Sequence, residues 1–333
     1  MKPFYSLKDG KRETIWKEFE ANLKMLETNI SRLKKWGDQG SNAPLYITFS
    51  HHFWNLFAGH ASSIDNPFLN QKEGRDTDIS GLGRLVIEQL LKRIPDGRRI
   101  LIDVKHLSRS SRASFYSIVR DFQSKNDQIP MIASHAAVTG ISKNSHKPHP
   151  FFNSSDINLF NEDIVEICNS NGLIGIMMEE GRLVDKTVMK LVKKSSGPHS
   201  EQLKAFYAVA VLANILHIVD IAGEKAWDCV CIGSDFDGMI NSLDTFDSVA
   251  TYPSLFKALH EILSSGNPIL FPSGGSDDVY AATEKLYSSE KIKDLMYGQH
   301  VDLIIEKLAY ANTERFLQSY FTESYLKSTL IIA

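Results

Sequence analysis

Cysteine is scarce in this sequence. Its 333 residues include three cysteines, at positions 168, 229 and 231. They form no C-x-x-C pair and are too few for a disulfide framework. Cys229 and Cys231 lie two residues apart within the apolar run CVCIG, so we expect both side chains on one face of a strand, as reduced thiols in the core. This low use of cysteine favours a reducing compartment.

An excess of either charge is also absent. The 37 lysines and arginines nearly balance the 40 acids, which leaves a net charge of -3 and a pI of about 6.4. A basic surface for nucleic acid or for an anionic membrane is therefore not indicated. The stretch GLG at residues 81–83 follows no predicted strand, which argues against a nucleotide-binding loop. We expect a small-molecule partner and no nucleic acid.

Long apolar runs are missing as well. No stretch reaches the ~18 consecutive apolar residues that a membrane span needs. The opening residues, MKPFYSLKDGKRETIW, lack the apolar centre of a signal peptide. We therefore expect a cytoplasmic protein with no membrane span, an expectation that a secretion signal upstream of Met1 would change.

The sequence does contain a regular alternation of helical and strand-like segments. Apolar residues recur every three or four positions from Ile15 to Trp36, which predicts an amphipathic helix that ends at Gly37. Apolar, strand-like segments then follow at residues 45–54, 99–108, 129–137, 173–179 and 228–238. Helical segments are predicted between them, at residues 81–97, 111–125, 161–172 and 201–223.

This alternation predicts an α/β fold. Strands that are apolar throughout and separated by helices are typical of a parallel sheet covered on both faces, either a barrel or an open sheet. The length suits a single TIM-barrel-like (β/α)8 domain, since such barrels have ~250 residues or more. We expect an N-terminal helical segment in residues 1–40 and a barrel-like catalytic domain in residues 41–333.

Ionisable side chains follow four of the predicted strands. They are His51, His106, His135 and Asp235. Because the carboxyl ends of parallel strands lie at one edge of a sheet, these side chains are expected to gather at the edge where α/β enzymes carry their active sites. This is the strongest chemical signal in the sequence.

The residue types at this edge suit a metal centre. His106 and His135 end two strands separated by one helix, so they can reach one cation, and zinc binds imidazole nitrogen at ~2.0 Å. Asp235 can then accept a proton from a water activated by the metal. His51 is predicted to donate a hydrogen bond to the substrate oxyanion, although His52 is an alternative for this role. The alternative for Asp235 is a helix cap.

The chain resembles the membrane (renal) dipeptidase family, which consists of metal-dependent barrel hydrolases of the amidohydrolase type. The matching stretches occur in family order and include LYITFSHHFWN, ILIDVKHLS, MIASHAA, INLFNEDIVEI, GLIGIMM, HIVDIAG, CIGSDFDG, TYPSL and, more loosely, LAYANTERFL. The resemblance implies that His106 and His135 are metal ligands, that Asp235 handles the catalytic proton and that His51 contacts the scissile group. It also implies cleavage of dipeptides by a bridged pair of zinc ions, and some members open β-lactam rings.

The chain departs from the family pattern at three positions. The family's His-x-Asp pair is missing before His51, and Ile157 stands where the family has an arginine for the substrate carboxylate. Glu20 lies at about the right distance for the bridging glutamate, but its helical surroundings argue against this role. One metal site and the strands that carry it are therefore expected to be missing, which predicts a barrel that is incomplete or modified at its N-terminus. Either the chain is an N-terminally shortened member of the family, or the opening helix and another subunit, in a homodimer, cover the exposed sheet edges.

Taken together, these features predict a zinc-dependent hydrolase that cleaves a dipeptide or small amide with one or two zinc ions. The rival interpretation is a mononuclear or non-catalytic relative that binds a small ligand or a partner.

Overall fold

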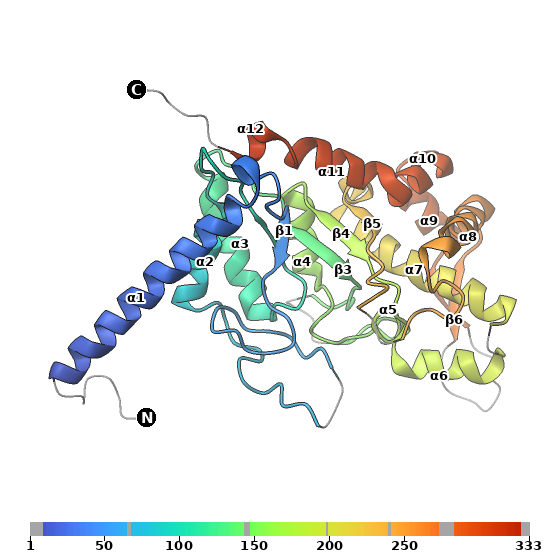
Figure 1. Ribbon diagram of the computed structural model, residues 1–333. Helices are drawn as coiled ribbons and strands as arrows, with labels where there is room; N and C mark the ends of the chain where they lie inside the picture. Colours follow the sequence, from blue (N-terminus) through green and yellow to red (C-terminus); the bar gives the residue numbers. More distant parts are fainter. Residues whose placement is uncertain are drawn as a thin grey trace.

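The computed structural model describes residues 9–64, 68–142, 147–197, 199–238, 241–272 and 283–327. At its centre is a five-stranded sheet in which every strand is parallel to its neighbour (Figure 1). The strands are β1 (Tyr46–Thr48), β2 (Leu101–Asp103), β3 (Ile132–Ala136), β4 (Leu173–Ile176) and β5 (Val230–Ile232).

The strands follow one another across the sheet in chain order, from β1 to β5. A doubly wound sheet reverses its strand order at one point, whereas the wall of a barrel proceeds in one direction. The predicted α/β fold with a parallel sheet is therefore confirmed. Within the described ranges this parallel sheet is an open wall of five strands, not a closed ring of eight.

Helices connect the successive parallel strands. The connections contain α2 (Gly81–Leu91), α3 (Arg109–Gln123), α4 (Asn161–Asn169) and, between β4 and β5, α5 (Glu180–Leu183), α6 (Lys186–Ser195), α7 (Glu201–Ala222) and the 3-10 turn η3 (Glu224–Asp228). Ser80, Ser108 and Ser200 begin α2, α3 and α7, and each side-chain oxygen accepts a hydrogen bond from a backbone N–H of the first turn. Such caps satisfy donors that a helix leaves free, so the helix starts are set locally by the sequence.

Helix α7 is the central helix of the hydrophobic core. It is apolar around most of its circumference, and side chains such as Tyr207, Val211 and Ile215 are completely buried. By length and composition alone it would suit a membrane span, yet 67% of its most apolar window is buried inside the protein. A helix that is apolar on all sides is expected in the core of a protein of this size.

Helix α1 (Asp9–Lys34) confirms the predicted N-terminal helix, although it begins and ends a few residues earlier than the periodicity indicated. Gly37 follows at a φ of 80°, a left-handed conformation that suits glycine. The end of α1 packs beside α2 through Ile30, while its beginning extends away from the rest of the molecule (Figure 1). The 3-10 turn η2 (Asp38–Gly40) leads from it toward β1.

The chain after β5 packs against helices α6 and α7 and against strands β4 and β5. Its elements are η4 (Val249–Thr251), α8 (Tyr252–Ser265), the antiparallel pair β6 (Ile269–Pro272) and β7 (Thr283–Tyr287), α9 (Ser289–Leu295), α10 (Val301–Glu306), the π-helical turn η5 (Lys307–Ala311), α11 (Asn312–Tyr320) and α12 (Glu323–Leu326). Buried Asn312 donates from Nδ2 to the backbone oxygens of Trp227 and Val230, at 2.8 and 2.7 Å. These bonds attach α11 to the start of β5, the end of the strand away from the predicted site.

Candidate functional site

The structure brings the four predicted site residues together at the carboxyl edge of the sheet. The ring centres of His51 and His106 are 4.4 Å apart, and those of His106 and His135 are 5.3 Å apart. His135 Nε2 lies 3.6 Å from Asp235 Oδ2. The predicted convergence is therefore confirmed, while the role of each residue remains a prediction.

His106 and His135 have the spacing of two ligands of one zinc ion. Their Nε2 atoms are 3.3 Å apart. Two nitrogens that each lie 2.0–2.1 Å from a tetrahedral zinc ion are about 3.3–3.4 Å from each other. The imidazoles therefore fit a metal, and Asp235 lies beside them as a carboxylate neighbour.

His51 and His52 add two further imidazoles to the same group. Ligating atoms of His51, His52 and His106 all lie within 4.8 Å of one another, close enough to hold a metal ion. His52 is also hydrogen-bonded through Nδ1 to Ser63 Oγ at 2.6 Å, which orients its ring. The sequence left open which of the two adjacent histidines faces the site. In the structure the rings of both lie beside the ring of His106.

A hydrogen-bonded chain orients His135. Its Nδ1 lies 2.7 Å from Ser134 Oγ, and this hydroxyl donates to Asp103 Oδ2 at 2.6 Å. Asp103 is completely buried and also accepts hydrogen bonds from Thr48 Oγ1 and from the backbone N–H groups of Ser134 and Lys105. Metal-binding histidines characteristically have such a partner on the second ring nitrogen, because it fixes the ring and its tautomer.

Two glycines leave room for the backbone of Ser134, which belongs to the hydrogen-bonded chain that orients His135. A Cβ atom on Gly175 of β4 would lie 2.2 Å from the backbone oxygen of Ser134, and one on Gly233 after β5 would lie 1.9 Å from it. Both distances are far below van der Waals contact. Glycine at these positions therefore allows β4 and β5 to approach the residue that positions His135.

Two of the site residues have unusual backbone conformations. His106 has a φ of 67° and Asp235 a φ of 60°, in the left-handed region that residues with a Cβ seldom adopt. Each residue turns the chain just beyond the end of its strand, β2 or β5. Such conformations cost about 1–3 kcal/mol and cluster at functional sites.

Burial determines the protonation of the imidazoles. It lowers the pKa of His106 far below its usual value and that of His135 to about 3, and the nearby Lys105 ammonium lowers both further. Burial likewise lowers the pKa of His51. These rings are therefore neutral at physiological pH, the form in which imidazole binds a metal. Burial raises the pKa of Asp235, which makes it a better proton acceptor than an exposed aspartate.

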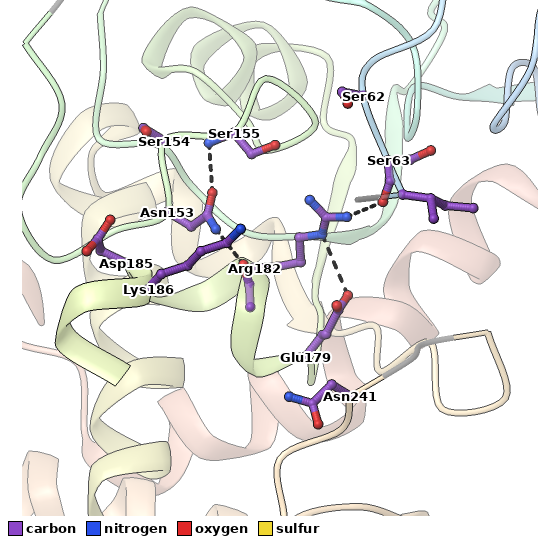
Figure 2. A pocket seen from close by; sticks show the side chains of 12 residues that line it. Ser62, Ser63, Asn153, Ser154, Ser155, Glu179, Arg182, Asp185, Lys186 and Asn241 are labelled. Atoms are coloured by element: carbon purple, nitrogen blue, oxygen red, sulfur yellow. Dashed lines mark hydrogen bonds and ion pairs between the residues drawn. The ribbon is translucent and has the colours of Figure 1, made fainter. Parts of the chain in front are cut away.

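A cavity of about 180 Å³ lies directly at these groups. Its lining comprises His52, Ser63, Ile64, Lys105, His106, His135, Ile157, Met177, Glu179, Arg182, Asp235 and Gly238. A larger cleft of about 760 Å³ adjoins it and shares four of these residues, among them Arg182, whose side chain lies between Glu179 and Ser63 in Figure 2. Ile157, which stands in place of the family's arginine, is buried in the cavity wall and contributes no charge.

Glu20 lies outside this site. It is an exposed residue of α1 and does not line the cavity. Its helical surroundings, which argued against a bridging role, are confirmed.

Sequence reasoning missed three charged residues of the cavity, Lys105, Glu179 and Arg182. The rule that found the histidines would have found Glu179, because it follows β4 in the segment LIGIMMEEGRL. Lys105 was visible as a lysine beside His106 in an apolar strand. Arg182 gave no comparable signal, because it lies within the short helix α5.

Comparisons with known proteins agree on one family. Residues 20–267 match the membrane dipeptidase family, peptidase family M19. An uncharacterized dipeptidase of Schizosaccharomyces pombe is 23% identical over 245 residues, which are 74% of this chain and 47% of that protein. This chain thus spans about half of the length of that relative.

Solved structures of lower similarity include two peptidases. One is a metallopeptidase from Rhodobacter sphaeroides bound to a phosphinate mimic of the dipeptide L-Ala-D-Ala, with 16% identity, a TM-score of 0.43, and coverage of 74% of this chain and 48% of that one. The other is the probable dipeptidase PvdM from Pseudomonas aeruginosa, with 17% identity, a TM-score of 0.42, and coverage of 86% and 64%. The family match includes β1 to β5 and all four predicted site residues, so this chain belongs to the membrane dipeptidase family.

Proposed function

We propose that this protein is a zinc-dependent hydrolase that cleaves a dipeptide or another small amide. The observation that carries the proposal is the 3.3 Å separation of the His106 and His135 Nε2 atoms, with Asp235 3.6 Å from the second of them. Membership of the membrane dipeptidase family supports the reaction class.

The four ionisable residues at the carboxyl edge of the sheet have complementary tasks in this reaction. His106 and His135 would hold the zinc ion, which when bound lowers the pKa of water toward ~7. Asp235 accepts a proton from the attacking water and passes it to the leaving amine. His51 donates a hydrogen bond to the carbonyl oxygen as negative charge develops there. The buried walls exclude bulk water, which strengthens each of these interactions.

A second candidate is a mononuclear or non-catalytic relative that binds a small ligand or a partner. It is favoured by the apolar Ile157 in the cavity wall, which cannot form an ion pair with a substrate carboxylate. One metal can suffice for hydrolysis, so the number of bound ions does not alone distinguish the candidates.

Metal analysis of the purified protein tests the proposed ligands. We expect at least one equivalent of zinc in the wild type and its loss in His106→Ala and in His135→Ala. His260→Ala is the matched control, because His260 lies on the surface of α8 and pairs with Asp302. Unchanged metal content in the first two variants would contradict the proposed site.

Hydrolysis of dipeptides tests the role of Asp235. We expect Asp235→Asn to keep its zinc and to lose roughly 100-fold or more in turnover, because the proton acceptor is gone. Asp237→Asn is the matched control, two residues further along the chain at an exposed position. Full activity of Asp235→Asn would show that another group handles the proton.

A further inference from the structure

Lys105 is a buried cation without a close counter-charge. It follows β2, has 3% of its surface exposed and lines the cavity beside His106. Its Nζ lies 4.0 Å from Met177 Sδ, and among the described residues no carboxylate oxygen lies within ion-pair distance of it. Burying a charge without a partner is costly, so such a residue requires an explanation.

The carboxylates near this lysine face other groups. They are Asp103, Glu179 and Asp235. The first is saturated by the hydrogen bonds from Thr48, Ser134 and the Lys105 backbone described above. Glu179 Oε2 lies 3.7 Å from Arg182 Nε, and Asp235 Oδ2 lies 3.6 Å from His135 Nε2.

Arg182 brings a second cation to the same cavity. Its side chain is 18% exposed and lines both the cavity and the adjoining cleft. Nη2 donates to the backbone oxygen of Ser63, as Figure 2 shows. After burial, repulsion by Arg182 is the largest influence on the pKa of Lys105, and both lower it. Lys105 therefore has a repelling cation nearby and, among the described residues, no carboxylate within ion-pair distance, an arrangement that the carboxylate of a ligand would relieve.

We infer that Lys105 and Arg182 form a subsite for a carboxylate group of the ligand. The inference rests on the proposed function in one respect, namely that this cavity receives the substrate. Lys105 would donate to a carboxylate oxygen from inside the cavity, and Arg182 would lie at its boundary with the cleft. Glu179 and Asp235 also line the cavity and would repel a dianion, so a singly charged carboxylate fits better than a phosphate.

Binding of a matched acid and amide to the purified protein tests this subsite. Propionate and propionamide have the same size and differ in charge, and their affinities can be measured by ligand-observed NMR. We expect the wild type to bind propionate roughly 10-fold tighter or more, the usual gain from a charge-assisted hydrogen bond in a buried site. Lys105→Met should bind both compounds equally. Lys190→Met, which removes a charge from the exposed face of α6, should keep the wild-type preference.

Each outcome of this experiment is informative. A wild type that binds both compounds equally, or binds neither, overturns the inference. A preference that persists in Lys105→Met assigns the carboxylate to another group, such as a bound metal, and also overturns it. If thermal unfolding shows that Lys105→Met is not folded, Arg182→Gln replaces it and must lose the preference. If the protein prefers propionate but hydrolyses no dipeptide, the subsite stands and the proposed function is refuted. If it hydrolyses dipeptides without this preference, the proposed function stands and the subsite is refuted.

Discussion

The substitution Lys105→Met is expected to stabilise the metal-free protein. Methionine is about as long as lysine and apolar, so the change removes the buried charge while it largely preserves the packing. Replacing a buried, unpaired charge by an apolar group of similar volume removes a desolvation cost. A residue that weakens the fold in this way would be retained for its function.

The magnitude follows from the pKa of the lysine. Burial, together with repulsion by Arg182, lowers it from 10.5 to about 7. At about 1.36 kcal/mol for each pH unit, the charged lysine costs about 5 kcal/mol of stability below pH 7. The unfolded chain holds this proton between pH 7 and 10.5 while the folded protein does not, so stability rises with pH across this window. The cost is about 3 kcal/mol near pH 8 and vanishes above about pH 10.5.

Urea unfolding of the chelator-treated protein measures the effect. We expect the free energy of unfolding of Lys105→Met to exceed that of the wild type by several kcal/mol near pH 6, and the difference to shrink as the pH rises toward about 10. Lys190→Met, at an exposed position, should change stability by less than about 0.5 kcal/mol. A variant that is no more stable than the wild type near pH 6, or a difference that does not depend on pH, would refute the reasoning.

Two further predictions concern the supports of the site, and a third concerns the opposite end of β5. Ser134→Ala removes the hydroxyl that orients His135 and should weaken zinc binding roughly 10-fold to 100-fold in competition with a chromophoric chelator, with the circular dichroism spectrum unchanged. Gly233→Ala places a Cβ against the Ser134 backbone and should weaken zinc binding and also lower the melting temperature; normal values would show that the strands can shift without cost. Asn312→Ala leaves two buried carbonyls without a donor and should cost about 1–3 kcal/mol in urea unfolding, whereas Gln318→Ala, on the exposed side of the same helix, should be neutral.

The sequence by itself determined the α/β alternation and the edge at which the ionisable residues gather. Apolar strands separated by helices require parallel pairing, and parallel strands place the residues that follow them at a common edge. This is why His51, His106, His135 and Asp235 could be grouped although up to 184 positions separate them, from 51 to 235.

The tertiary structure alone decided which side chains enter the cavity. Lys105 and His106 are adjacent in sequence, and both line the cavity. The chain turns at His106 with a positive φ, and the presence of a histidine does not predict such a backbone conformation. Neither the close packing of two glycines against Ser134 nor the position of Arg182 follows from local periodicity. Beyond a strand end, the direction of a side chain depends on backbone turns and on contacts between distant segments, and these are fixed only when the chain is packed.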